Sequence, residues 1–384
     1  MASVTLRAWQ REALPLWEAS GHRGIVSVVT GGGKTVFALA CIAKLEPDTS
    51  LVIVPTVALL DQWWEEIAHF FSLELDEVHI VTANQSMRTG TINIAVLNTA
   101  AKLQEGGRSR PCFLIVDECH KAASAQFRTA LDIPREASLG LSATPERPYD
   151  DGLNDIIVPA LGPLIYEYTY RSALGEHVIV PFELRNIVFE LEKDRQQEYD
   201  KLTKAIACAI RRYGTEAPET VNLYLRRART MNLCPNRVRL ALKLVAKHRG
   251  RRILIFHEDV EACNLIYQVL VENGVRAGIY HSRLKLKERV TVLAAYRKGS
   301  VQVLVTCKAL DEGFNVPETE IGIIAASTAT RRQRIQRLGR VLRPANGKEG
   351  AIIYTLIATV PEFRRLKEEE AEMEGVASAS WSRA

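Results

Sequence analysis

Thr30-Gly31-Gly32-Gly33-Lys34-Thr35 joins an apolar, β-branched run over residues 25–29 to a helical pattern over residues 35–45. A glycine-rich turn between a strand and a helix is typical of a phosphate-binding loop, because glycines let backbone N–H groups converge on phosphate oxygens. In such a loop the lysine reaches the β- and γ-phosphates of ATP and the threonine hydroxyl binds Mg²⁺. We therefore predict that ATP contacts Thr30, Gly31, Gly32, Gly33, Lys34 and Thr35, with Thr35 also a Mg²⁺ ligand. The strict pattern has glycine at position 28, where this chain has valine.

Short apolar runs alternate with helical patterns on both sides of this loop. In the first half, runs bounded by turn residues predict strands at 25–29, 51–54, 92–97, 113–116 and 138–141. The second half repeats the pattern at 253–256, 303–305, 321–325 and 351–356. This alternation is typical of parallel sheets covered by helices. We predict an α/β fold with two domains, residues 1–180 and 181–384, which suits a chain of 384 residues.

A helical segment of different composition lies between the two halves. Residues 193–250 show helical spacing that Pro218 and Pro235 interrupt, which predicts an insertion of about three helices. Between Arg195 and Arg252 there are 15 basic and 4 acidic residues, whereas the whole chain has a net charge of only +5. A basic module on an otherwise acidic chain indicates a polyanionic partner, although solvated helix faces would give the same pattern.

Composition argues against several classes of protein. No apolar run reaches the roughly 18 residues of a membrane span, and the first ten residues lack the apolar segment of a secretory signal. The seven cysteines are scattered without a Cys-x-x-Cys pair, which argues against a zinc site or a disulfide framework and favours a cytoplasmic protein. Residues 362–375 predict a charged helix, and residues 376–384 predict a frayed tail.

Asp117-Glu118-Cys119-His120 directly follows the apolar run over residues 112–116. A carboxylate at the end of a parallel strand beside a phosphate loop can hold Mg²⁺, and we assign this role to Asp117. Glu118 is placed to orient the attacking water and take its proton. Two acids at the end of a strand are common, so this assignment depends on the neighbouring phosphate loop.

Ser142-Ala143-Thr144-Pro145 follows the next predicted strand. Ser142 and Thr144 carry small hydroxyl groups that can relay hydrogen bonds between the domains. His120 can couple the acidic pair to this loop, to Gln333 or to Gln336. An ordinary turn before a proline is the alternative interpretation.

Two further patterns point to the same nucleotide. Gln336, Arg340 and Arg343 fall at i, i+4 and i+7 of a predicted helix, so they share one face, and two guanidinium groups there can clamp a γ-phosphate. Ahead of the loop, Gln10 presents a donor and an acceptor that suit an adenine edge, and Arg7 can stack on the ring. Taken alone, either pattern also fits an amphipathic helix with a solvated polar face.

In this order the segments resemble the superfamily 2 nucleic-acid helicases and translocases, over residues 6–344. TGGGKT matches motif I, DECH matches motif II, SAT matches motif III and QRLGRVLR matches motif VI. TCKALDEGFNVP, residues 306–317, matches motif V and adds Asp311 and Gly313 to the implied nucleotide site. The resemblance implies two tandem RecA-like domains with a helical insertion, ATP and Mg²⁺ as cofactors, and ATP hydrolysis that drives movement along nucleic acid.

The resemblance also implies where a nucleic-acid strand would bind. Contacts would go mostly to phosphates and would be independent of base sequence. The residues at the matching positions are Thr56, Asn98, Thr99, His281, Ser282 and Thr306, and the basic insertion would add Arg226, Arg227 and Arg229.

Within the superfamily, the segments LGLSATPER, 165–168, 180–182 and QRLGRVLRP are similar to the xeroderma pigmentosum group B type, which favours DNA over RNA. Repair members of that type carry Arg-Glu-Asp after motif III, where this chain has Glu146-Arg147-Pro148, so strand opening that depends on Arg-Glu-Asp is not expected. Only six residues precede Arg7, so we expect targeting to come from a partner such as a nuclease or a DNA-targeting subunit.

Two other functions fit the same motifs. One is an ATP-gated clamp or scaffold that holds DNA for a nuclease or repair partner, and the other is an RNA helicase. ATPase stimulation by matched DNA and RNA, measured together with oligonucleotide displacement, separates these functions from a DNA motor.

Overall fold

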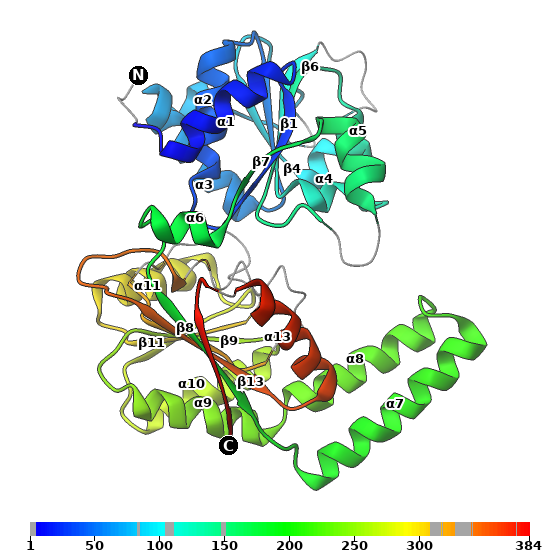
Figure 1. Cartoon of the computed structure of the whole chain (residues 1–384), viewed down its shortest axis with the longest axis vertical. Coiled ribbons are helices and arrows are strands. Elements are labelled where there is room, and N and C mark those ends of the chain that lie inside the picture. The colour runs from blue at the N-terminus through cyan, green and yellow to red at the C-terminus, as the bar shows by residue number, and fades with distance from the viewer. Residues whose placement is uncertain are drawn as a thin grey trace. The chain divides into compact units, whose positions relative to one another are not determined.

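The computed structural model describes residues 5–82, 85–103, 111–146, 151–307, 316, 318–326, 339, 341–373 and 375–384. They form two compact units that divide between Glu176 and His177 (Figure 1). Asp311, Gly313, Gln336 and Arg340, four residues predicted to contact the nucleotide, lie outside the described residues. No helix in the described part of the chain is long and apolar enough to cross a membrane.

The first unit is built on a seven-stranded parallel sheet in the order β3-β4-β2-β5-β6-β1-β7. Its strands are β1 (Arg23–Val28), β2 (Ser50–Val54), β3 (His79–Ile80), β4 (Ile92–Val96), β5 (Cys112–Asp117), β6 (Arg135–Ser142) and β7 (Leu164–Tyr168). Its helices are α1 (Ala8–Ala19), α2 (Lys34–Leu45), α3 (Val57–Phe71), α4 (Leu97–Ala100), α5 (Val158–Leu161) and α6 (Tyr170–Gly175).

The second unit repeats this architecture with a second seven-stranded sheet, in the order β10-β11-β9-β12-β13-β8-β14. Its strands are β8 (Phe182–Val188), β9 (Ile253–His257), β10 (Ala277–Tyr280), β11 (Val303–Cys307), β12 (Ile321–Ile324), β13 (Ala351–Ile357) and β14 (Ser378–Arg383). Its described helices are α7 (Lys193–Tyr213), α8 (Pro218–Asn232), α9 (Pro235–Lys247), α10 (Val260–Glu272), α11 (Leu286–Lys298) and α13 (Val360–Glu372).

Central strands are apolar on both faces, as a parallel sheet covered by helices requires. Every residue of β2 and of β5 is buried, and every residue of β9 and of β11 is buried in the second unit. The predicted α/β class with two parallel sheets is confirmed.

The basic segment divides into two parts with different surroundings. Helices α7 and α8 run side by side as a hairpin that projects from the second unit (Figure 1). Helix α9 instead packs Val238, Ala241 and Leu244 into the core of that unit. The projecting part is therefore the α7–α8 hairpin, shorter than the 193–250 insertion expected from the sequence.

The expectation of a frayed tail over residues 376–384 is wrong. Residues Ser378–Arg383 form β14, which pairs in parallel with β8. The Trp381 ring packs on Phe363 with 4.8 Å between ring centroids, and its Nε1 donates to Glu370 Oε2 at 3.0 Å. A polar, small-residue segment thus gains order from the edge of a sheet and from one aromatic anchor.

Candidate nucleotide and nucleic-acid sites

The predicted phosphate loop lies at the carboxyl end of β1 and leads into α2, which begins at Lys34. Gly31 and Gly33 have φ of +88° and +94°, a backbone conformation that residues with a Cβ rarely adopt. The loop therefore needs glycine at these two positions for its course, and α2 presents its N-terminus and the dipole there to the loop.

Helix α1 braces the loop from behind. Trp9 Nε1 donates to Gly32 O at 2.9 Å, and Gln10 Nε2 donates to Gly33 O at 2.8 Å. Gln10 Oε1 also accepts from the Arg7 backbone N–H at 2.7 Å. Each of these Gln10 atoms keeps one further hydrogen-bonding position, so bracing is compatible with the predicted contact to adenine. The contact of Trp9 with the loop was not predicted from the sequence.

The loop carries polar groups that the described residues leave available to a ligand. The Thr30 hydroxyl oxygen is buried and has no hydrogen-bond partner among the described residues. Lys34 Nζ donates to Val28 O at 3.2 Å, a long bond that uses one of three ammonium donors. Buried polar groups are normally hydrogen-bonded, so an orphaned hydroxyl beside a free-ended ammonium fits a polyanionic ligand such as a triphosphate.

Asp117 and Glu118 lie at the carboxyl end of β5, which pairs with β6. Asp117 Oδ2 accepts from Trp63 Nε1 at 2.9 Å, and Asp117 Oδ1 accepts from the Glu118 backbone N–H at 2.9 Å. A carboxylate oxygen has two lone pairs, so each oxygen keeps one for a magnesium-bound water. Among the described residues no three His, Cys, Asp or Glu side chains form a metal cage.

His120 connects the acidic pair to the loop after β6. Its Nδ1 lies 3.0 Å from Ser142 Oγ and 3.5 Å from Glu118 Oε2, and Ser142 Oγ accepts from the Thr144 backbone N–H at 3.1 Å. Glu118 itself has the left-handed φ of +48°, which turns the chain sharply at the strand end. Of the three partners proposed for His120, the structure has the Ser142 loop, while Gln333 and Gln336 lie outside the described residues.

The order of the first sheet sorts the predicted residues into two neighbouring groups. The loop, Ser142 and Asp117 follow the adjacent strands β1, β6 and β5. The strands next to them are β2, which ends two residues before Thr56, and β4, which leads into α4 with its half-buried Thr99 and exposed Asn98. Nucleotide and nucleic-acid candidates thus lie side by side along one edge, where open α/β sheets bind ligands.

The second sheet places its nucleic-acid candidates in the same way. Thr306 lies in β11 and pairs in register with Tyr280 of β10, and His281 and exposed Ser282 follow directly. The Thr306 hydroxyl oxygen and His281 Nδ1 are both buried without a hydrogen-bond partner among the described residues. Burial, and then the charge of Arg283, lower the pKa of His281, so at neutral pH this side chain is an uncharged hydrogen-bonding group.

Arg343 is the one predicted phosphate-clamping arginine that the structure describes. It is half-buried in a bend that follows helical Val341. Its carbonyl accepts from Lys348 Nζ at 2.8 Å, and the same ammonium donates to Val341 O. Burial lowers the pKa of Lys348 to about 8, because a charged ammonium loses hydration there.

The three hairpin arginines have different surroundings. Arg226 lies 3.6 Å from Glu198, and Arg229 donates to Glu261 at 2.8 Å. Arg227 lies over the Tyr199 and Tyr224 rings, at 5.4 and 5.5 Å from their centroids. Arg226 and Arg229 are exposed, so these pairs are weak and can be exchanged for phosphates.

Two family models match the chain, one in each unit. The model described as the res subunit of type III restriction enzymes matches residues 3–147, and the helicase conserved C-terminal domain matches residues 236–345. Together they include the phosphate loop, the acidic pair and the QRLGRVLR segment.

Curated relatives match across nearly the whole chain. A "DNA 3'-5' translocase XPB2" of Sulfurisphaera tokodaii is 26% identical over 94% of this chain and 83% of its own length. A "DNA 3'-5' helicase XPB" of Kineococcus radiotolerans is 26% identical over 92% of this chain, which spans 60% of that protein. Among solved structures, Dbp5 of Saccharomyces cerevisiae bound to RNA and ADP BeF3 superposes with a TM-score of 0.61 at 15% identity, covering 98% of this chain and 89% of that one. At that identity the likeness extends to the fold alone.

Proposed function

We propose that this chain, which belongs to the XPB-like helicases and translocases of superfamily 2, hydrolyses ATP at the phosphate loop and uses it to move along DNA. The observation that carries the proposal is the shared edge of the first sheet. There the loop, Asp117 and Ser142 adjoin Thr56 and Asn98, so ATP and DNA would bind side by side along one edge of the sheet.

The first step is binding of the triphosphate at the N-terminus of α2. Lys34 would contact the β- and γ-phosphates and the Thr30 hydroxyl would gain its missing partner. Thr35 and Asp117 are the residues that would hold Mg²⁺, which when bound neutralises phosphate charge. Trp9 and Gln10 hold the loop backbone through their hydrogen bonds to Gly32 and Gly33, so the loop would need little rearrangement to bind the triphosphate.

The second step is proton removal from the attacking water. Glu118 would accept this proton, and His120 would transmit its change of charge to Ser142 and Thr144. Arg340 and Arg343 are the residues we propose for stabilising charge on the transferred phosphoryl group, on the support of their sequence pattern. Asp311, Gly313 and Gln336 stay predictions of the same kind.

The third element is the grip on nucleic acid. We assign it to Thr56, Asn98, Thr99, His281, Ser282 and Thr306 at the two sheet edges, and to Arg226, Arg227 and Arg229 on the hairpin. Reversing the three arginines should weaken DNA binding about equally across sequences and lower the salt slope by roughly one unit per lost contact. Lys298→Glu, at an exposed position of α11, is the control for each arginine reversed singly, since both changes alter the charge by two. An unchanged salt slope would leave the arginines as partners of Glu198 and Glu261 alone.

Steady-state ATPase with matched DNA and RNA, combined with triplex displacement, tests the function. We expect DNA to stimulate ATP hydrolysis more than RNA and to support ATP-dependent displacement. Stimulation without displacement would favour the ATP-gated clamp, and stronger stimulation by RNA would favour the RNA helicase. Targeting by a separate protein stays a prediction from the sequence.

A further inference from the structure

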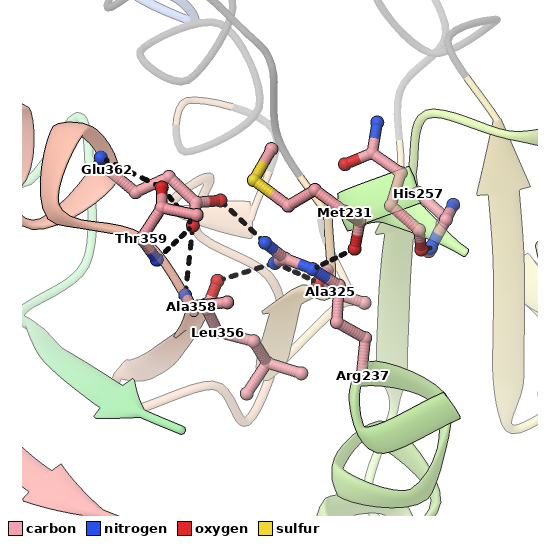
Figure 2. Close-up of polar contacts among 9 residues, drawn as sticks. Met231, Arg237, His257, Ala325, Leu356, Ala358, Thr359 and Glu362 are labelled. Carbon is pink, nitrogen blue, oxygen red and sulfur yellow. Dashed lines mark hydrogen bonds and ion pairs between the residues drawn. The ribbon is translucent and has the colours of Figure 1, made fainter. Parts of the chain in front are cut away.

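An arginine in α9 is completely buried in the second unit, far along the chain from the predicted phosphate clamp. The Arg237 side chain is 0% exposed. Its Nε donates to Met231 O at 3.1 Å, its Nη1 donates to Ala325 O and to Leu356 O at 2.9 Å each, and its Nη2 donates to Glu362 Oε1 at 2.7 Å. Figure 2 shows these contacts converging on one guanidinium group.

The four acceptors come from four different elements. Met231 lies in the last turn of α8, where the hairpin returns to the unit. Ala325 directly follows β12, Leu356 lies near the carboxyl end of β13, and Glu362 lies in the first turn of α13. One planar group therefore ties the end of the hairpin to the carboxyl edge of the sheet.

Glu362 is fixed on its other side as well. Its Oε2 accepts from the backbone N–H groups of Ala358 and Thr359 at 2.9 and 3.0 Å, and from the Thr359 hydroxyl at 3.1 Å. These bonds cap α13 (Figure 2). The carboxylate cannot leave Arg237 without uncapping that helix, so the ion pair is held in one geometry.

A second group holds the neighbouring hairpin residue. His257, at the end of β9, has its Nε2 3.1 Å from Asn232 O, and its Nδ1 accepts from the Asp259 backbone N–H at 3.0 Å. Accepting at Nδ1 leaves the proton on Nε2, which donates to Asn232. The last two carbonyls of α8 are thus held by two buried side chains.

The first residues of the hairpin are tied down too. Glu192, which precedes α7, accepts from Cys234 Sγ at 3.0 Å and from the Asn236 backbone N–H at 2.8 Å. Cys234 and Asn236 flank the start of α9. We call Glu192, Met231, Asn232, Arg237 and His257 the hairpin mount, because they hold both ends of α7–α8.

Burying a charged guanidinium is costly unless all its partners are in place, and a well-packed apolar side chain often stabilises a core at least as much. Stability alone therefore does not account for arginine at this position. What an apolar side chain lacks is the planar fork that holds separate acceptors in a fixed arrangement. The hairpin mount therefore fixes the orientation of the α7–α8 hairpin relative to the second sheet.

The mount shares its edge with the residues assigned to ligand binding. Along the second sheet the strands β10, β11, β9, β12 and β13 are neighbours. His281 and Thr306 lie within one residue of the ends of the first two strands, and His257, Ala325 and Leu356 lie at or within one residue of the ends of the next three. Ala325 also lies two residues before the segment 327–340, which leads to the predicted phosphate clamp.

We propose that Arg237 is a positioning residue that fixes the α7–α8 hairpin to this sheet edge, so that a shift of the edge during ATP hydrolysis moves the hairpin with it. The inference rests on the proposed function for the part that concerns ATP and DNA. The connection is stiff because Arg237, His257 and Glu362 are buried and their hydrogen bonds join separate elements.

The fixed angle is tested first, without ATP. Cys208 on α7 is the one exposed cysteine of the seven, so a spin label can be placed there, with a second label at Gln268→Cys on exposed α10. Pulsed electron paramagnetic resonance should give a narrow distribution of the distance between the two labels in the otherwise unchanged chain. In Arg237→Lys, which keeps the charge opposite Glu362 and loses the fork, the distribution should broaden at least twofold.

Coupling is tested next, by the number of nucleotides moved per ATP hydrolysed on single DNA molecules. Arg237→Lys should keep DNA-stimulated ATPase within about twofold and lower this number at least fivefold. Arg251→Lys is the matched control, since Arg251 pairs with Glu320 at 2.7 Å on the surface of the same unit and touches no mount residue. If Arg237 had a merely structural role, Arg237→Lys would lower the unfolding temperature and leave the number of nucleotides moved per ATP unchanged.

The outcomes separate the two proposals. If the unmodified chain shows no DNA-stimulated ATPase, the proposed function fails and takes the coupling role with it. If the unmodified chain is a motor and Arg237→Lys keeps both the narrow distribution and the nucleotides moved per ATP, the inference is overturned alone. Should Arg237→Lys not fold, Glu362→Gln enters the same two measurements, because it keeps a cap for α13 and removes the charge that orients the guanidinium.

Discussion

The phosphate loop and the hairpin mount use buried polar groups in opposite ways. In the loop, α1 holds the backbone from behind through Trp9 and Gln10, while the Thr30 hydroxyl has no partner among the described residues. In the mount, four hydrogen bonds to protein atoms occupy the Arg237 guanidinium. The loop is arranged to receive a ligand, and the mount is arranged to transmit a position.

This difference predicts which variants act on chemistry and which act on the folded state. A group that waits for a ligand costs little stability when removed, because few protein contacts are lost. A group whose partners are all protein leaves those partners buried and unpaired. Variants in the two regions should therefore separate cleanly between turnover and stability.

The largest effect is expected in the loop. Lys34→Ala should reduce ATP turnover on the order of 10³-fold or more, because the charge on the transferred phosphoryl group loses a fixed cation. Its unfolding free energy should change by less than about 1 kcal/mol, since Lys34 Nζ makes one long bond, to Val28 O. Steady-state ATPase and urea unfolding measure the two quantities. A large loss of stability would mean that Lys34, like the residues of the hairpin mount, mainly supports the folded state.

Glu118→Gln is the companion variant in the same region. It should keep ATP binding and stall hydrolysis, because a carboxamide cannot take a proton from water. Binding of a fluorescent ATP analogue and single-turnover hydrolysis separate the two steps. Normal turnover would show that another group is the base.

The sequence could predict the loop because its signal is local. Six consecutive residues between an apolar run and a helical pattern specify strand, turn and helix, and the positive φ of Gly31 and Gly33 is what the glycines predict. The placement of Asp117 and Ser142 at neighbouring strand ends could be predicted too, since both follow apolar runs and β1, β6 and β5 are neighbours.

The mount could not be predicted because its partners are distant in the chain. Arg237 and Glu362 are 125 residues apart, and Arg237 lies inside a basic segment where the sequence suggests exposed charge. The hydrogen bonds of Trp9 and Trp63 could not be predicted for a similar reason, since their indole N–H groups reach Gly32 and Asp117 only in the folded sheet. The prediction of a frayed tail was wrong because β14 forms by pairing with β8, which is distant in the sequence.

The next effect is expected in the mount. Arg237→Met should destabilise the second unit by roughly 3–5 kcal/mol, because it leaves the Glu362 carboxylate buried without its cation. Arg237→Met combined with Glu362→Gln should recover part of that loss, since no uncompensated charge remains. Urea unfolding of the two variants measures the difference. Equal stability of the single and the double variant would mean that the ion pair is not what holds the mount together.

A smaller effect should appear on acidification. Burial, and then the charge of Arg237, lower the pKa of His257 from 6.5 to about 4, and the carboxylates of Asp259 and Glu258 oppose that shift only in part. The unfolded chain therefore binds more protons than the folded chain between pH 6.5 and 4. Stability that is complete above pH 6.5 should fall across this window, by up to about 3 kcal/mol. His257→Gln keeps a donor for Asn232 without titrating, so the difference between the two pH profiles isolates this group. Parallel profiles would contradict a neutral His257.

The smallest effect compares one glycine from each unit. Gly33 and Gly274 have φ of +94° and +72°, so alanine at either position costs about 1 kcal/mol of backbone strain. At Gly274 a Cβ would meet nothing within 4 Å, whereas at Gly33 it would lie 2.9 Å from Gln10 Nε2, the atom that braces the loop. Gly33→Ala should therefore cost about 1 kcal/mol more than Gly274→Ala, the value of one hydrogen bond. It should also weaken ATP binding, because the loop loses its brace at the point where α2 begins. Urea unfolding and ATP titration of both variants give the comparison, and Gly274→Ala should bind ATP normally. If both variants lost the same stability and bound ATP equally well, the contact between α1 and the loop would be incidental, and the phosphate loop would hold its shape through its own backbone alone.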